Sequence, residues 1–154
     1  MTKIAPAGGA ERLSNTITIV THDNKDLLNR VAAGVFDLPV NDSLLSEFLS
    51  DPRHHLVVAI DDAVVVGMAS AVHYVHPDKP PQLWINEVAV APLHRGRGVG
   101  KELINALLNL ARQLNCTEAW VLTDRSNSGA MKVYAGCGGI ESPRDEVMFS
   151  FPLH

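Results

Sequence analysis

The chain has 154 residues, enough for about one domain with a substantial buried core. Apolar residues make up 46% of it, and 17 acidic against 13 basic side chains give a formal net charge of −4. That balance argues against a nucleic-acid partner and slightly favours a cationic one, and no apolar run approaches the roughly 18 residues that span a bilayer, so no membrane partner is expected.

The first 15 residues contain Ala, Gly and Pro without periodicity and lack the apolar stretch of a signal peptide. We therefore expect a flexible leader over residues 1–15 and a single domain over residues 16–154. Cys116 and Cys137 are the only cysteines, too few for a disulfide framework. They favour a reducing compartment, the cytoplasm.

The first half of the domain alternates between strand and helix patterns. Residues 16–20 read as a strand, residues 25–36 as a helix, and residues 44–50 as a short helix capped by Asp42-Ser43. Residues 55–60 and 64–74 form a predicted hairpin around a tight turn at residues 61–62. A strand over residues 83–90 follows a proline-rich loop.

The second half begins with apolar residues at helical spacing from Val99 to Leu114, which predict a long amphipathic helix. A strand over residues 117–122 comes next, then a helix capped by Asn127 or Ser126 and ended by Gly138-Gly139. Residues 146–153 alternate like a last strand. The order predicts an α/β fold, a mixed sheet with helices on both faces.

The most informative segment is Arg95-Gly96-Arg97-Gly98-Val99-Gly100, between a predicted strand and the long helix. Glycines without a Cβ let consecutive N–H groups converge on phosphate oxygens, and the helix adds the positive end of its dipole there. The segment therefore predicts a ligand that carries phosphate. It is neither a Walker loop, since Glu102 stands where a hydroxyl holds Mg²⁺, nor a Rossmann fingerprint, since Lys101 replaces the third glycine.

The pattern Arg95-x-x-Gly98-x-Gly100 resembles the R/Q-x-x-G-x-G/A loop of the GCN5-related N-acetyltransferases (GNAT). The resemblance covers residues 17–152 and includes the segments 86–92 and 127–134. Within the family the chain is most similar to the single-domain aminoglycoside 3-N-acetyltransferases, through Phe36-Asp37, Asp124 and residues 146–151. It implies the GNAT fold, with a mostly antiparallel mixed sheet.

The resemblance also implies acetyl-CoA as cosubstrate. The loop would hold the pyrophosphate, the main chain of the preceding strand would pair with the pantetheine amides, and Asn127 would cap a helix and contact the CoA arm. The residues expected to bind CoA are thus Val88, Ala89, Val90, Arg95, Gly96, Arg97, Gly98, Val99, Gly100, Lys101 and Asn127.

Two residues are candidates for proton transfer. Glu87 shares strand parity with Leu83, Ile85 and Ala89, which predicts a carboxylate in apolar surroundings with a raised pKa, suited to deprotonate an ammonium. The alternative is a strand-end Glu paired with a nearby Arg. The family pattern N-x-x-A-x-x-x-Y places the Tyr134 hydroxyl near the CoA sulfur as proton donor, although a helical Tyr on an apolar face is more often core.

Acids near the family's substrate cleft would hold a polycationic amine, and we assign this role to Asp37, Asp124 and Asp145. Asp42 and Glu146 fit a solvated surface better. The expected reaction is direct acetyl transfer to the 3-amino group of an aminoglycoside, which would confer antibiotic resistance, and relatives of this kind are commonly dimers. The alternatives are a polyamine, amino acid or protein amine as acceptor, or a non-catalytic acyl-CoA-binding module.

Other reactive side chains receive structural roles. Cys137 lies between two glycines without a supporting His or Asp, so we interpret it as a structural thiol and not as a nucleophile. The histidine pairs His54-His55 and His73-x-x-His76 lack a third ligand, and neighbouring strand residues point to opposite faces. No metal is assigned.

Overall fold

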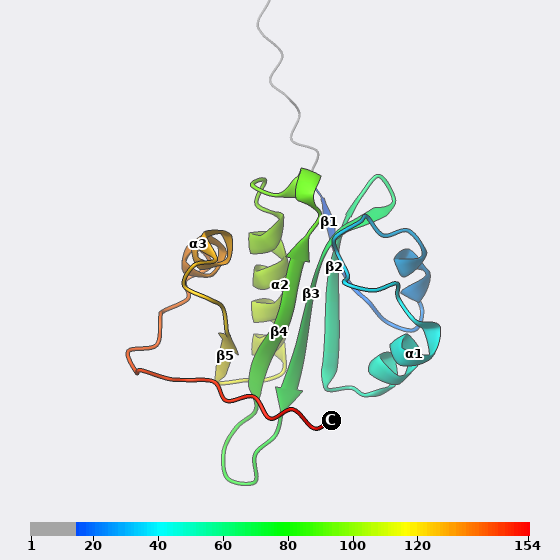
Figure 1. Cartoon of the computed structure of the whole chain (residues 1–154). Helices are drawn as coiled ribbons and strands as arrows, with labels where there is room; N and C mark the ends of the chain where they lie inside the picture. Colours follow the sequence, from blue (N-terminus) through cyan, green and yellow to red (C-terminus); the bar gives the residue numbers. More distant parts are fainter. Residues whose placement is uncertain (1–14) are drawn as a thin grey trace, which may run out of the picture.

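The computed structural model describes residues 15–154 and has a five-stranded sheet at its centre (Figure 1). The strands lie in the order of the sequence; the first four are antiparallel, and β5 runs parallel to β4. The strands are β1 (Thr16–Ile19), β2 (His54–Asp61), β3 (Val64–Tyr74), β4 (Gln82–Val90) and β5 (Glu118–Val121). The predicted mixed, mostly antiparallel sheet is confirmed.

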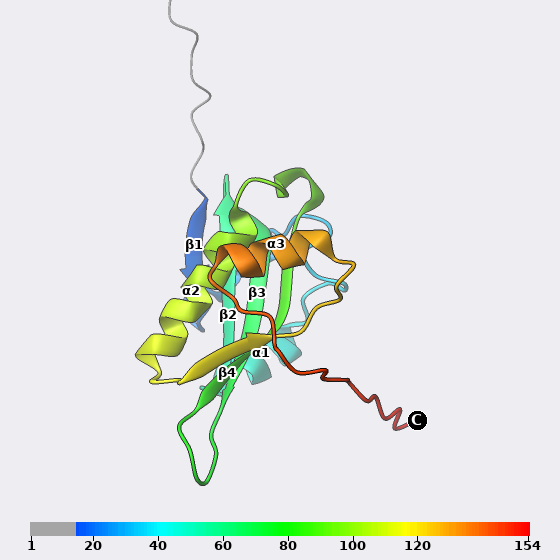
Figure 2. The same cartoon turned by 90° about the vertical axis from the view of Figure 1, so that its left-hand side faces the viewer.

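Helices cover both faces of the sheet, as predicted (Figure 2). The long helix α2 (Val99–Gln113) lies on one face, where its Leu103 and Leu107 are fully buried. Gly67 of β3 allows this close approach, because a Cβ there would lie 3.1–3.2 Å from Val99 and Leu103 side-chain atoms. Helix α3 (Ser128–Gly136) packs beside α2, and α1 (Asp42–Ser50) lies on the opposite face next to β2.

A bulge in β4 decides which way the site residues point. Ala71 of β3 pairs with Ile85, but the adjacent Ser70 pairs with Glu87, so Asn86 is an extra residue in β4. Because side chains alternate along a strand, one extra residue reverses the alternation. Ile85 faces α2 together with Ala71, whereas Glu87 shares the opposite face with Ser70.

The helix predicted over residues 25–36 is wrong beyond its first turn. The structure has a 3-10 helix, η1 (Lys25–Asn29), after which the chain extends along β3. Val65 N donates to Arg30 O and Ala32 N donates to Val65 O, and Gly34 then adopts φ +83°. Pairing with the sheet therefore overrides the local helical pattern.

The strand predicted over residues 146–153 does not form. This segment has no regular structure, and Val147, Phe149 and Phe151 are each more than 70% exposed. Figure 2 shows the C-terminal tail running away from the body of the molecule. An alternating pattern gives a strand only where a neighbouring strand pairs with it, and the tail does not meet the outer edge of β5.

Smaller differences concern helix ends and the N-terminus. Asn41 caps α1, because its side chain accepts a hydrogen bond from Leu44 N, and the helix begins at Asp42, two residues earlier than predicted. Between β4 and α2 lies a single 3-10 turn, η2 (Pro92–His94). The leader predicted for residues 1–15 lies, apart from its last residue, outside the described part of the chain.

Candidate active site

The glycine loop presents unpaired main-chain donors at the start of α2. Gly96 and Gly98 have φ of +72° and +86°, values that favour glycine, and Gly98 is the residue before the helix. Within residues 15–154, no acceptor pairs with the N–H groups of residues 96 to 101. A Cβ on Gly96 or Gly98 would meet nothing within 4 Å, so space is open in front of these donors. The loop fits a diphosphate.

The three cations of the loop point in different directions. Arg95 and Arg97 are exposed, and Arg95 Nε donates to Val90 O at 3.0 Å, which folds this side chain against the end of β4. Lys101 lies along α3, since a Cβ on Gly136 would be 3.2 Å from its Nζ. The two arginines are therefore at the loop, whereas the Lys101 ammonium is at the C-terminal end of α3.

The second half of β4 has an open edge toward β5. The two strands pair only from Gln82 to Ile85 of β4, so the outer side of residues 86 to 90 faces no strand (Figure 1). Ala91 N donates to Val66 O, and the alternation of an antiparallel ladder then turns the main-chain groups of Val90 and Val88 outward and those of Ala89 toward β3. Val88 thus presents both its main-chain groups to an extended ligand, and Val90 presents its N–H, since the Val90 carbonyl already accepts from Arg95.

Glu87 has the raised pKa that the sequence predicts. The side chain is exposed, but neighbouring protein atoms displace part of the water around its carboxyl, which raises its pKa, and the negative charge of Asp37 raises the pKa further. The argument from parity with Leu83 and Ile85 is wrong, because the bulge turns Glu87 to the other face of the sheet. Of the three residues predicted to share the face of Glu87, Ala89 is the one that does. The alternative of a Glu paired with an Arg is not what the structure has: in residues 15–154, Glu87 makes no ion pair.

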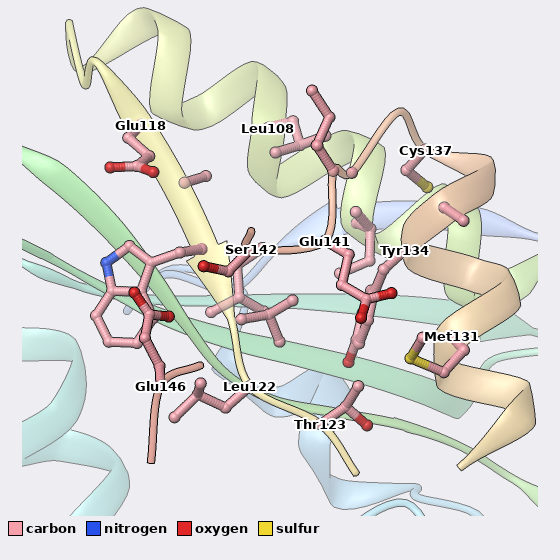
Figure 3. Close-up of a pocket in the computed structure, with 18 of the residues that line it drawn as sticks. Leu108, Glu118, Leu122, Thr123, Met131, Tyr134, Cys137, Glu141, Ser142 and Glu146 are labelled. Carbon is pink, nitrogen blue, oxygen red and sulfur yellow. The ribbon is translucent and has the colours of Figure 1, made fainter. Parts of the chain in front are cut away.

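Tyr134 projects from α3 into a cavity of about 1000 Å³ that extends around the free edge of β5 (Figure 3). Ile104 and Leu108 of α2, Met131 of α3 and Val121 of β5 supply its apolar lining. Burial raises the pKa of the Tyr134 hydroxyl, which keeps its proton in place at neutral pH. The side chain also packs against the core, so the core interpretation and a role in the cavity are compatible.

The other predicted site residues are distributed over several loops. Asn127 caps α3 as predicted, since its side chain accepts from Ala130 N at 3.1 Å. Asp37 is exposed and close enough to Glu87 to affect its pKa, which brings this pair together. Asp124 lies in the exposed loop between β5 and α3, and Asp145 lies in the exposed tail. Nothing in the structure joins either of them to the Glu87–Asp37 pair.

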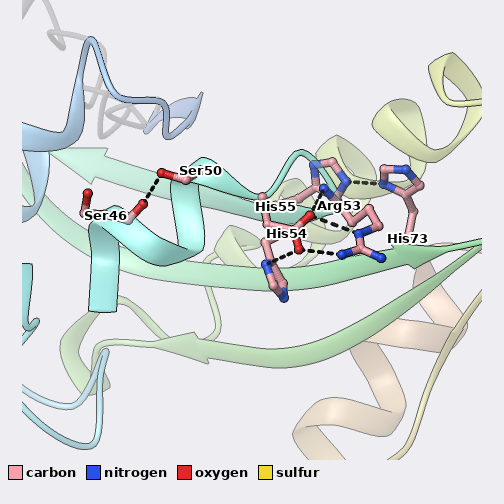
Figure 4. Close-up of polar contacts among 7 residues, drawn as sticks. Ser46, Ser50, Arg53, His54, His55 and His73 are labelled. Carbon is pink, nitrogen blue, oxygen red and sulfur yellow. Dashed lines mark hydrogen bonds and ion pairs between the residues drawn. The ribbon is translucent and has the colours of Figure 1, made fainter. Parts of the chain in front are cut away.

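The histidines pair across strands in a way that the sequence did not indicate. His55 Nε2 and His73 Nδ1 lie 2.8 Å apart, on β2 and β3, while His54 contacts Asp51 (Figure 4). Among the described residues, no group of three His, Cys, Asp or Glu side chains is placed to hold a metal ion. Burial raises the pKa of Cys137, which fits a structural thiol and not a nucleophile.

Comparisons with known proteins show to which family the chain belongs. The model of the acetyltransferase (GNAT) family matches residues 21–138. The chain belongs to the GNAT family. Its members use acetyl-CoA as acetyl donor, which agrees with the open diphosphate cradle at the start of α2.

Individual GNAT proteins match only part of this chain. N-acetyltransferase 8B of Rattus norvegicus is 31% identical over 96 residues, which is 62% of this chain and 43% of that protein. The chain thus spans less than half the length of this curated relative.

Many solved structures share the fold of this GNAT chain, including two that are similar over at least 90% of its length. One is an aminoglycoside acetyltransferase from an uncultured soil metagenomic sample in complex with trehalose (TM-score 0.77, 18% identity, 95% of this chain and 100% of that one). The other is AAC(6')-Iy in complex with a bisubstrate analogue, CoA-S-monomethyl-acetylneamine (TM-score 0.69, 24% identity, 90% of this chain and 97% of that one). At these identities the likeness shows the fold alone.

Sequence reasoning gave no role to Trp84 and Trp120. They are paired in the register of β4 and β5, and their rings stack on the sheet face opposite α2. The signal was present in the sequence: Trp84 stands between Leu83 and Ile85, both buried, so it had to point away from the core. A large aromatic side chain at an outward strand position is a recognition candidate.

Proposed function

We propose that this protein transfers the acetyl group of acetyl-CoA directly to a primary amine, and that its acceptor is the 3-amino group of an aminoglycoside. The observation that carries the first part is the run of unpaired N–H groups from residue 96 to residue 101, opening onto free space at a helix N-terminus. A diphosphate is the group of acetyl-CoA that such a run would bind. The two exposed arginines add charge-assisted hydrogen bonds.

The bound thioester supplies an activated acetyl group, and the residues of the chain supply the rest. Main-chain N–H groups at the open edge of β4, at Val88 and Val90, are the donors available to hold the substrate and polarise its carbonyl. Glu87 takes a proton from the ammonium, directly or through water; its raised pKa makes it a better base than an ordinary carboxylate. Tyr134 keeps its proton at neutral pH and is the candidate donor to the leaving thiolate.

The charges of the protein support a cationic acceptor. The net charge is −4, and the Asp37 carboxyl interacts with that of Glu87, which lies on the face of β4 turned away from α2. We infer that Asp37 holds an ammonium group of the acceptor beside Glu87, and that Asp124 and Asp145 hold further ones. A polycation fits this arrangement better than a monoamine. Two cysteines without a disulfide in the structure are consistent with action in the cytoplasm.

One assay separates the candidate acceptors. Release of free thiol from acetyl-CoA is measured with kanamycin, spermidine, 2,4-diaminobutyrate and a lysine-containing peptide. We expect release with kanamycin at the highest kcat/KM, and NMR of the product to place the acetyl group on the 3-amino nitrogen. If only spermidine, the diamino acid or the peptide gave release, that amine would be the acceptor in place of an aminoglycoside. Tight CoA binding without turnover on any amine would make the protein a binding module.

A further inference from the structure

A pair of stacked tryptophans lies on the same side of the sheet as Glu87. Trp84 of β4 and Trp120 of β5 face each other in the strand register, and their ring centroids are 5.6 Å apart at an interplanar angle of 14°. Trp84 is 36% exposed, whereas its neighbours Leu83 and Ile85 are buried against α2. We call Trp84, Trp120 and the adjoining Tyr74 the tryptophan wall. It is an aromatic surface that the described part of the chain leaves partly uncovered.

Hydrogen bonds hold Trp120 and Tyr74 in place, and Trp84 stacks on the Trp120 ring that they hold. Trp120 Nε1 donates to Tyr74 Oη at 2.9 Å, and Tyr74 Oη donates to Gln82 Oε1 at 2.7 Å. Gln82 Nε2 in turn donates to Glu118 Oε2 at 3.1 Å. The network joins β3, β4 and β5 and satisfies the polar atoms of both aromatic rings. A surface held in one orientation loses little conformational entropy when a ligand stacks on it.

The β4 bulge brings the wall and Glu87 to one face. Residues three apart in a regular strand point to opposite faces, so Trp84 and Glu87 would be separated by the sheet. The extra residue Asn86 reverses the alternation between them, and Glu87 then pairs with Ser70 on the face of Trp84. The negative charge of Asp37 acts on the Glu87 carboxyl. The exposed indole of Trp84 and the proposed base Glu87 therefore lie on the same face of the sheet.

Carboxylates lie on the other side of the wall as well. Glu118 and Glu146 line the same cavity as Tyr74 and Trp120 (Figure 3), and Glu118 is part of the hydrogen-bond network. Aromatic faces stack on the flat faces of rings, and carboxylates hold ammonium groups. A ligand that matches both is a ring that carries amines. A linear polyamine matches only the charge.

We propose that the tryptophan wall is a ring-binding subsite that selects a cyclic, multiply protonated amine, whose ring stacks on Trp84 while one amine reaches Glu87. This inference rests on the proposed acetyl transfer and deepens it, since it assigns the preference for a ring to specific side chains. Trp84 is then a specificity residue, and the bulge is the feature that places it beside the reaction.

The test compares a cyclic and a linear amine on wild type, Trp84→Leu and Trp84→Phe. Neamine and spermidine serve as acceptors. We expect Trp84→Leu to raise KM for neamine by about 10-fold or more, from loss of stacking, with kcat and the KM for spermidine changed less than about 2-fold. Trp84→Phe should recover most of the loss. Equal losses with both amines, or no loss, would overturn the proposal.

Direct binding separates this proposal from the acetyl-transfer proposal. The two tryptophans of the chain both belong to the wall, so tryptophan fluorescence, excited where tyrosine does not absorb, reports on this surface alone. Neamine should change the wild-type fluorescence saturably, and spermidine at the same charge concentration should not. In Trp84→Leu, the remaining Trp120 signal should not respond. A saturable response without thiol release would support the ring-binding subsite and reject the proposed acetyl transfer. The absence of a response would reject the ring-binding subsite.

Discussion

At the scale of single residues, Glu87 is the group whose chemistry the structure defines best. Its carboxyl has a raised pKa because neighbouring protein atoms displace part of the water around it and because Asp37 repels its negative charge. The base must be ionised to act, so turnover should rise with pH through this raised pKa and level off above it. Removal of Asp37 should shift that rise to lower pH.

We expect Glu87→Gln to lower kcat by about 10²- to 10⁴-fold, the range that general acid–base catalysis commonly contributes. The acidic limb of the pH–rate profile should disappear in this variant, while CoA affinity stays within 2- to 3-fold of wild type by calorimetry. Glu47→Gln on α1, an exposed change of the same kind, is the control and should leave the profile intact. A wild-type profile in Glu87→Gln would remove Glu87 as the base.

At the scale of elements, the contact between β2 and β3 contains a pH-sensitive pair. Burial, and then the charge of neighbouring histidines, lowers the pKa of His55 to about 4, and its ring lies against that of His73. The folded state therefore holds His55 neutral where the unfolded chain would protonate it, with an ordinary pKa near 6.5. Stability is unaffected above this value and falls as pH drops from about 6.5 toward about 4.

Urea denaturation at pH 7.5 and pH 4.5 measures this effect. We expect the titration of His55 to lower the free energy of unfolding by about 1–2 kcal/mol between pH 7.5 and pH 4.5. This figure allows for the solvent that screens a partly exposed ring. His55→Gln should reduce the pH dependence by that amount. An identical pH dependence in wild type and variant would show that the ring titrates normally in the folded state.

Also at this scale, the sequence predicts elements that follow from local pattern and misses those that depend on a partner. The amphipathic α2, the Asn127 cap and the β2–β3 hairpin are set by spacing, capping and turn residues, and all three are present. The segment after Asn29 and the tail after Glu146 also have clear patterns. Their conformation depends on whether a strand is available to pair, which local sequence does not encode.

The same limit applies to the candidate site. The loop at Gly96 and Gly98 is evident from the sequence because the required φ values select glycine. The face to which Glu87 points is not, because it depends on the extra residue Asn86, and nothing in the strand pattern indicates a bulge there. Its raised pKa was predicted correctly, although the surroundings assigned to it were those of the other face.

At the scale of the whole molecule, the exposed apolar tail predicts association. Val147, Met148, Phe149 and Phe151 lie in a segment without regular structure, and each is more than 70% exposed. Such patches on a folded protein commonly mark an interface. We therefore expect a homodimer in which residues 146–153 are covered.

Sedimentation equilibrium checks this expectation. The wild-type chain should sediment as a dimer, and the double change Phe149→Ser and Phe151→Ser should weaken dimerisation by at least about 10-fold, because it removes on the order of 2 kcal/mol or more of apolar burial. Leu93→Ser, which is also highly exposed but lies in η2, is the matched control. A monomeric wild type would reject the dimer.

The central claim is that the turn from Arg95 to Gly100 binds the diphosphate of CoA, and calorimetric titration of CoA against two glycine variants tests it most directly. Gly98 and Gly138 have φ of +86° and +88°, and a Cβ on either would meet nothing within 4 Å. Alanine at each should therefore destabilise the fold alike, by about 1–2 kcal/mol. We predict that Gly98→Ala lowers CoA affinity by at least about 10-fold, since its Cβ enters the space of the phosphates, and that Gly138→Ala binds CoA like wild type. Equal affinity in both variants would contradict the account.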